Sequence, residues 1–239
     1  MNTYLSLVTL LVVLCTSTAS AQLFDKLKKQ AQDVVKNPSS LTQEDAAAGL
    51  KEALIKGISN GADLVSRLDG YYKNPEIKIP FPAEAKQVES KLRSVGLGKQ
   101  ADDVILSVNR AAEDAATEAK PVFIAAIKGM TFSDALSIVR GDERAATTYL
   151  QRTTTPELIT KFTPIIKSSL EKVNATKYWE TAMTSYNKIP FITKVNPNLT
   201  EYVTQKAIEG LFIMIAKEEL SIRKDPAART SELLKKVFG

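Results

Sequence analysis

Three pairs of oppositely charged residues are spaced as neighbours on a helix surface. The pairs are Arg110 with Glu113, Lys206 with Glu209, and Glu219 with Arg223. Residues three or four apart on a helix can form an ion pair, which stabilises the helix by about 0.2–0.5 kcal/mol. If the pairs also converge in one partly buried region, they can bind an anionic or zwitterionic ligand, because a guanidinium presents a planar fork of donors. We therefore take these six side chains as the candidate ligand-binding site and expect them to meet in one concave region.

Most other site chemistry is limited by the residue types that the chain lacks. The sequence contains no histidine, and its single cysteine is Cys15. Without an imidazole there is no Ser–His pair and no His-bound zinc. We find neither a G-x-x-x-x-G-K-[ST] nor a G-x-G-x-x-G phosphate loop, and we expect no catalytic residue, no metal site and no cofactor. One enzymatic alternative stays open, a carboxylate-based hydrolase of an envelope polymer, which needs two acids facing each other across a groove.

The first 21 residues have the pattern of a cleaved secretory signal. An apolar run of about ten residues from Leu5 to Leu14 is too short to span a hydrocarbon core. Ala19-Ser20-Ala21 follows, the small-x-small pattern that signal peptidase accepts. We predict export to the periplasm or cell envelope after cleavage behind Ala21. Two alternatives are a lipoprotein that carries its lipid on Cys15 and an uncleaved membrane anchor.

Residues 22–39 are predicted to form an amphipathic helix and a linker. The apolar stripe consists of Leu23, Phe24, Leu27, Ala31, Val34 and Val35, and Asn37-Pro38 ends it. The other faces carry more lysine than acid. Residues 22–37 could therefore lie on a membrane surface, which gives the alternative function of a membrane-surface or scaffold protein. The other interpretation is an ordinary terminal helix.

Residues 40–239 are predicted to be helical almost throughout. The expected helices run from Thr42 towards Asp69, over 84–95, over about 99–119, from Pro121 to Gly129, from Thr131 to Gly141, from Thr155-Pro156 to Val173, over 199–224, and from Asp225-Pro226 to Phe238. Capping boxes at Thr42/Asp45, Thr131/Asp134 and Asn198/Glu201 mark three of the starts. Glycines in the first helix and alanines in the third suggest close helix contacts rather than helix ends.

The helix over 199–224 is expected to be the central one. Its segment Gly210–Ala216 is apolar on every face, and a helix that is apolar all round is buried all round. We therefore predict an all-α, single-domain, multi-helix bundle built around a buried helix in the C-terminal half.

Only two segments read as extended, and both contain Lys-Ile-Pro-Phe. They are Ile77–Pro82 and Lys188–Phe191. Their prolines confine them to a sheet edge or to irregular structure. We expect at most a short extended ribbon between the two segments or a groove that both line; coincidental reuse of a proline-set turn is the alternative.

The charge balance gives weak information about partners. The chain has 32 Lys and Arg against 27 Asp and Glu, a net charge of +5. These charges are interspersed, and no basic block is interleaved with aromatics, so we expect no nucleic-acid partner. An envelope polyanion or an anionic membrane surface fits the charge better. We expect a monomer, or at most a weak oligomer, whose partner is a small ligand or an envelope protein.

Several short motifs, in this order, resemble a known bacterial family of exported proteins. They are Ala48–Leu54, Lys78-Ile79-Pro80, Asn109–Glu113, Ala126–Met130, Tyr202–Ala207 and the ending Leu233–Gly239. Together they resemble domain of unknown function 4197 over roughly residues 40–239. The resemblance implies a bacterial cell-envelope protein, and it carries no established activity. The leading hypothesis is a non-catalytic periplasmic protein that binds a small ligand or a protein partner.

Overall fold

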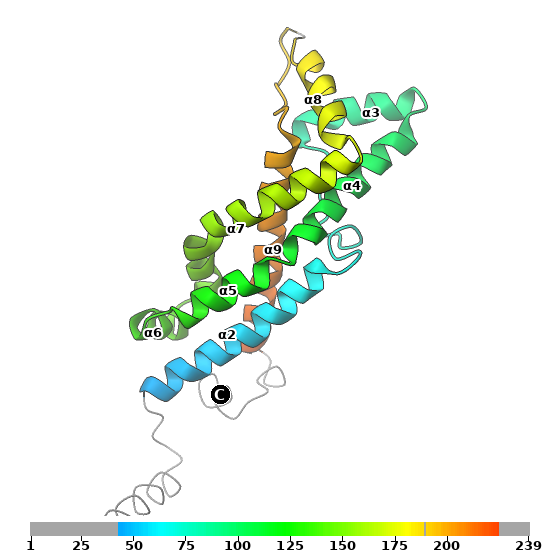
Figure 1. The fold of residues 1–239 in the computed structure, drawn as a ribbon. Coiled ribbons are helices and arrows are strands. Elements are labelled where there is room, and N and C mark those ends of the chain that lie inside the picture. Colours follow the sequence, from blue (N-terminus) through cyan, green and yellow to red (C-terminus); the bar gives the residue numbers. More distant parts are fainter. Residues whose placement is uncertain (1–42, 189, 225–239) are drawn as a thin grey trace, which may run out of the picture. The chain divides into compact units, whose positions relative to one another are not determined.

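Every regular element in the described part of the chain is a helix (Figure 1), which confirms the predicted all-α class. The structure is a computed structural model and describes residues 43–188 and 190–224. The elements are α2 (Gln43–Ser66), a 3-10 turn (Ala83–Ala85), α3 (Lys86–Ser94), α4 (Gly98–Ala116), α5 (Ala119–Lys128), α6 (Phe132–Arg140), α7 (Ala145–Lys172), α8 (Ala175–Tyr186) and α9 (Leu199–Lys224). The predicted signal peptide (1–21), the predicted helix and linker over 22–39, the predicted cap at Thr42 and the helix predicted from Asp225 lie outside the described residues.

The described helices differ from membrane-spanning helices in length or composition. No single one of them is long and apolar enough to cross a bilayer. Taken together, Gly98–Lys128 and Phe132–Arg140 are long and apolar enough to cross a bilayer, by length and composition alone. These two parts are bent by 105° against each other.

Two helix starts follow the predicted capping chemistry. The Thr131 hydroxyl accepts a hydrogen bond from Asp134 N (3.1 Å), and the Asp134 carboxylate accepts one from Thr131 N (3.0 Å). At α9 the Asn198 side chain accepts a hydrogen bond from Glu201 N (3.0 Å). Each cap satisfies backbone N–H groups that have no partner within the helix, so local sequence is enough to fix these starts.

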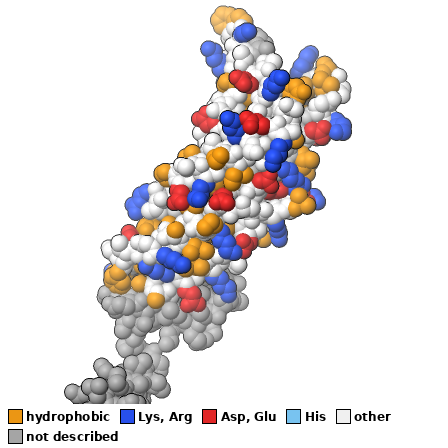
Figure 2. Space-filling view, in the orientation of Figure 1, with side chains coloured by type: hydrophobic (Ala, Val, Ile, Leu, Met, Phe, Trp, Pro, Cys, Tyr) orange, Lys and Arg blue, Asp and Glu red, His pale blue; other side chains and the backbone are white. Residues whose placement is uncertain are grey.

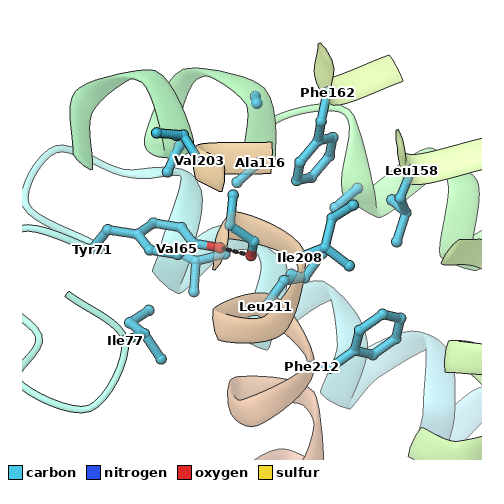
Figure 3. Packing of buried hydrophobic residues seen from close by; sticks show 14 of the residues in the cluster. Val65, Tyr71, Ile77, Ala116, Leu158, Phe162, Val203, Ile208, Leu211 and Phe212 are labelled. Atoms are coloured by element: carbon cyan, nitrogen blue, oxygen red, sulfur yellow. Dashed lines mark hydrogen bonds between the residues drawn. The ribbon is translucent and has the colours of Figure 1, made fainter. Parts of the chain in front are cut away.

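Helix α9 packs against α2, α4 and α7, as predicted for a central helix. Figure 3 shows Ile208 and Phe212 among buried side chains of the other helices, and the Phe212 ring meets the edge of Phe123 at 5.7 Å. The prediction that Gly210–Ala216 is buried all round is wrong in one respect. Ile213 is 39% exposed, because it lies on a strip of α9 that none of the described helices buries.

Small residues allow the helices to approach closely, as predicted. The alanines of α4 at positions 111, 112, 115 and 116 are completely buried. A Cβ atom added at Gly57 of α2 would lie 2.7 Å from Ile222 Cδ1, and one at Gly61 would lie 3.1 Å from Ile215 Cδ1. These two glycines therefore mark the line where α2 contacts α9.

The predicted helix start at Thr155-Pro156 is wrong, because α7 begins at Ala145 and continues through both Pro156 and Pro164. The side-chain hydroxyl of Thr155 donates to Gln151 O (2.6 Å), which is the bonding of a residue inside a helix rather than of an N-cap. Buried residues lie on both sides of the proline, including Leu150 and Leu158. Burial of this continuous stripe offsets the cost of an internal proline, about 3 kcal/mol.

The sequence allowed at most a short ribbon between the two Lys-Ile-Pro-Phe segments, and in the described residues neither segment is a strand. The first segment is irregular, with Ile77, Ile79 and Phe81 buried. Its backbone groups at Ile79 are paired by the side chain of Asn109 instead of by a second strand. The second segment lies between α8 and α9, where Phe191 is fully exposed.

Candidate functional site

All three predicted ion pairs form, but they do not gather in one region. The Nη1 atom of Arg110 lies 2.5 Å from Glu113 Oε2, Lys206 Nζ lies 2.6 Å from Glu209 Oε2, and Arg223 Nη2 lies 2.8 Å from Glu219 Oε1. At 1.5 Å per residue, Lys206 and Glu219 are separated by about 20 Å along α9. The predicted convergence of the six side chains is therefore wrong, and their binding of a ligand stays a sequence-based prediction.

The Arg110–Glu113 pair closes the turn that follows α2. The buried Glu113 carboxylate accepts hydrogen bonds from Tyr71 N and Tyr72 N, both at 3.0 Å. Arg110 also binds Asp69 (2.6 Å), and hydrogen bonds from Lys73 and then Arg110 hold the pKa of Asp69 below its usual value. The carboxylates of Glu113 and Asp69 therefore fix the turn after α2 to α4 through these bonds.

The Glu219–Arg223 pair anchors the start of α7. Glu219 accepts hydrogen bonds from Ala146 N (3.0 Å), Thr147 N (2.8 Å) and the Thr147 hydroxyl (2.7 Å). Arg223 donates to Ile138 O (2.9 Å) at the end of α6. A carboxylate at a helix N-terminus is favoured by the free N–H groups and the helix dipole. The third pair, Lys206–Glu209, is largely exposed.

A groove with a volume of about 470 Å³ lies between α3, α4 and α8. We call it the α8 groove. Its apolar lining includes Phe81, Val88, Leu92, Val104, Trp179 and Met183, and its polar lining includes Gln100, Asp103, Ser107 and Tyr178. This size and this mainly apolar lining are typical of small-molecule sites, which measure about 300–1,000 Å³.

Helix α8 forms one wall of the α8 groove because the chain changes direction at Asn174 (Figure 1). This residue has a left-handed backbone (φ 53°), which asparagine tolerates better than most residues, and it ends α7. Trp179 is then held in place by a hydrogen bond from its Nε1 to Asn196 O (3.1 Å). Its ring also packs against Phe81, with 5.6 Å between the ring centroids.

The chemistry of the α8 groove favours binding over hydrolysis. Asp103 is the one carboxylate in the described lining, and it is engaged by Lys99 at 2.9 Å. Hydrolysis by a carboxylate pair needs two acids across the substrate. Among the described residues, no group of three acidic side chains is placed to hold a metal ion. The groove therefore offers an apolar surface with a polar rim and no evident reactive pair.

Comparison with known families gives one match, to the family described as Protein of unknown function (DUF4197), over residues 40–239. The chain belongs to this family. A search of curated proteins found no significant match, and neither did a search of solved structures.

The motifs by which the chain resembles DUF4197 contact one another in the structure. Lys51 Nζ donates to Met130 O (2.6 Å), and this bond joins the first motif to the fourth. Asn109 bonds to Ile79, joining the second motif to the third. Tyr71, which lies in none of the motifs, donates to Ala207 O (2.6 Å) in the fifth. Two of these bonds therefore join motifs that are far apart in the sequence.

Sequence reasoning missed the lining of the α8 groove. It predicted no helix over residues 175–186, and of the groove's aromatic residues it named only Phe81, within the segment Ile77–Pro82 that could line a groove. One signal was available: Trp179, the only tryptophan in the chain, precedes Met183 by one helical turn. Such a pair indicates an apolar helix face, but it does not show whether that face is covered.

Proposed function

We propose that this DUF4197 protein is a non-catalytic protein of the cell envelope that binds a small apolar or amphiphilic ligand in the α8 groove. The observation that carries the proposal is the groove itself, with its volume of about 470 Å³ and its aromatic and aliphatic lining. An alkyl chain would lie against Trp179, Phe81 and Met183, and the polar end of the ligand would stay at the rim near Gln100 and Ser107.

The absence of catalysis is supported by the residue types of the chain. A chain without histidine, whose only thiol lies in the leader, lacks the commonest acid–base and nucleophilic groups. The described lining of the groove contains one carboxylate, Asp103, and it forms an ion pair with Lys99. Binding requires none of these groups, because apolar contact provides the free energy.

The proposed location rests on the leader pattern of residues 1–21. Mass spectrometry of the protein from cells that express the full chain tests it. We expect Gln22 at the N-terminus and the protein in the fraction released by osmotic shock. An intact chain that starts at Met1 and remains in the cytosol would contradict the proposed location.

Ligand binding can be followed through Trp179, because the only tryptophan of the chain lines the groove. A bromine atom quenches tryptophan fluorescence on close contact. We expect 12-bromododecanoic acid to quench Trp179 in a saturable way and dodecanoic acid to reverse the quenching. Unchanged emission throughout the titration would show that the groove does not take an alkyl chain.

A matched pair of variants tests whether the ligand lies in the groove. Val104→Phe fills the groove from α4 and is expected to raise the dissociation constant at least about tenfold. A tenfold change corresponds to about 1.4 kcal/mol of binding free energy. Ile159→Phe adds the same ring at an exposed site on α7 outside the groove lining and is expected to leave binding unchanged. Equal affinities for the two variants would place the ligand elsewhere and exclude the groove as the site.

A further inference from the structure

The loop between α8 and α9 exposes an aromatic side chain on a structured base. Phe191 is fully exposed and has a left-handed backbone (φ 63°), which bulky residues rarely adopt. The base of the loop is closed by Asn187, whose side-chain amide donates to Val195 O (2.7 Å) and accepts from Val195 N (2.8 Å). The two ends of the loop are therefore fixed by these bonds, while the Phe191 ring stays in solvent, although burial of the ring would be favourable.

A second apolar projection lies at the turn between α3 and α4. Val95 is 57% exposed and Leu97 is 39% exposed, on either side of the left-handed Gly96 (φ 85°). Figure 1 places this turn and the α8–α9 loop at the same end of the helical domain, and Figure 2 shows hydrophobic side chains with basic ones beside them at both projections. The α8 groove lies between α3, α4 and α8, at this same end.

The charge of the α8–α9 loop is positive. Residues Asn187–Asn198 contain Lys188 and Lys194 and no acidic residue. Both lysines are exposed, and within the described part of the chain neither forms an ion pair. Basic side chains around an exposed aromatic ring match the interface of an anionic bilayer, where the ring enters the acyl region and the ammonium groups meet phosphates.

We infer that this end of the domain docks on the surface of an anionic phospholipid bilayer, with Phe191 inserted and Lys188 and Lys194 on lipid phosphates. Two separate apolar projections beside a basic loop suit a bilayer surface, which yields around them. The inference goes beyond the proposed function, and it brings the groove to the surface that supplies apolar ligands.

Vesicle binding by the purified protein tests the inference. The vesicles contain phosphatidylglycerol and phosphatidylethanolamine, and phosphatidylcholine vesicles serve for comparison. We expect co-flotation with the anionic vesicles only, at low salt of about 0.05 M, and weaker binding as salt screens the charges. Equal flotation with both vesicle types at every salt concentration would contradict a role of the lysines.

Substitutions at the loop identify the contact. Phe191→Ser is expected to lower the vesicle partition coefficient about tenfold, and Lys188→Gln combined with Lys194→Gln is expected to do the same at low salt. Phe132→Ser is the matched control, because Phe132 is also an exposed phenylalanine (40%) at a helix start elsewhere, in α6. Unchanged flotation of the loop variants would assign membrane binding to another part of the chain and overturn the inference.

A second readout separates insertion from loss of folding. Phe191→Cys and Phe132→Cys, each labelled with an environment-sensitive fluorophore, should behave differently, with a blue shift on anionic vesicles only at position 191. A concentration-dependent dimer that Phe191→Ser abolishes, with no vesicle binding, would make the loop a contact between copies and overturn the inference. Val104→Phe should bind 12-bromododecanoic acid more weakly but bind vesicles as the unchanged protein does. The two measurements therefore test the ligand site and the docking surface separately.

Discussion

The side-chain amide of Asn109 pairs with both backbone groups of Ile79, as a neighbouring strand would in a sheet. Its Nδ2 donates to Ile79 O and its Oδ1 accepts from Ile79 N, both at 2.8 Å, and Nδ2 also donates to Ile105 O (2.7 Å). Asn109 is completely buried in α4. The pairing fixes the irregular segment that leads to Phe81, so it also positions one wall of the α8 groove.

Asn109→Ala should destabilise the protein and loosen the α8 groove. The change leaves the N–H and C=O of Ile79 without their partner, and each unpaired buried group costs about 1–3 kcal/mol. Urea unfolding should show the loss, and Trp179 emission should shift to the red because Phe81 packs on its ring. Gln151→Ala, at an exposed site on α7, is the control, and equal stability of the two variants would contradict the prediction.

Glu219→Ala should cost far more stability than Glu209→Ala, although both residues form ion pairs on α9. Loss of Glu219 leaves Arg223 and two backbone N–H groups of α7 without this carboxylate, and breaking a buried pair costs about 3–5 kcal/mol. The exposed Glu209 pair contributes about 0–1 kcal/mol. Thermal or urea unfolding of the two variants measures the difference, and comparable losses would refute this assignment of structural roles.

Gly210→Ala should destabilise the protein more than Gly57→Ala. A Cβ at position 210 would lie 2.8 Å from Tyr71 Cε1, and this ring cannot shift easily because Tyr71 is fully buried and bonded to Ala207. Such overpacking costs about 1–3 kcal/mol. At Gly57 the one close contact of the new methyl is with the flexible end of Ile222, at 2.7 Å. Both glycines lie inside helices, so both variants gain about 1 kcal/mol of helix propensity, and the difference comes from the packing. Urea midpoints in the reverse order would contradict this packing argument.

Alkaline pH should destabilise the protein through Tyr202. Burial, together with the charges of Glu84 and Glu209, raises the pKa of Tyr202 to about 12, whereas an unfolded tyrosine titrates near 10. The contribution of Tyr202 to the free energy of unfolding is complete below about pH 10. It is lost as the pH rises from about 10 to 12, because the unfolded state releases the proton first. Burial raises the pKa of Tyr71 in the same direction.

The measurement for this prediction is the urea midpoint as a function of pH. Tyr202→Phe should show a shallower decline above about pH 10 than the unchanged protein, because phenylalanine has no proton to lose. The comparison removes the common effect of lysine titration. Superimposable pH profiles for the two proteins would show that Tyr202 is not responsible.

Local chemistry determined much of the fold from sequence alone. The capping box at Thr131, the cap at Asn198 and the three ion pairs all depend on residues within one helical turn of each other, and all of them form. The central place of α9 followed from its apolar composition. Its one exposed strip, at Ile213, did not, because composition cannot say which side the neighbouring helices leave uncovered.

Long-range packing decided the rest. Pro156 reads locally as a helix start, yet buried contacts on both sides carry α7 through it. The sequence predicts only ion pairs of Glu113 and Glu219 with nearby arginines. In the structure each glutamate also accepts hydrogen bonds from backbone N–H groups of a segment that is distant in the sequence. The α8 groove combines Phe81, Val104 and Trp179, which are neighbours only after the chain has folded. The sequence determined the helix starts that a local cap fixes, at Thr131 and Asn198, and it determined which helix is apolar, because those properties are local. The tertiary structure alone decided which apolar faces remain open to a ligand, because burial depends on what the rest of the chain covers.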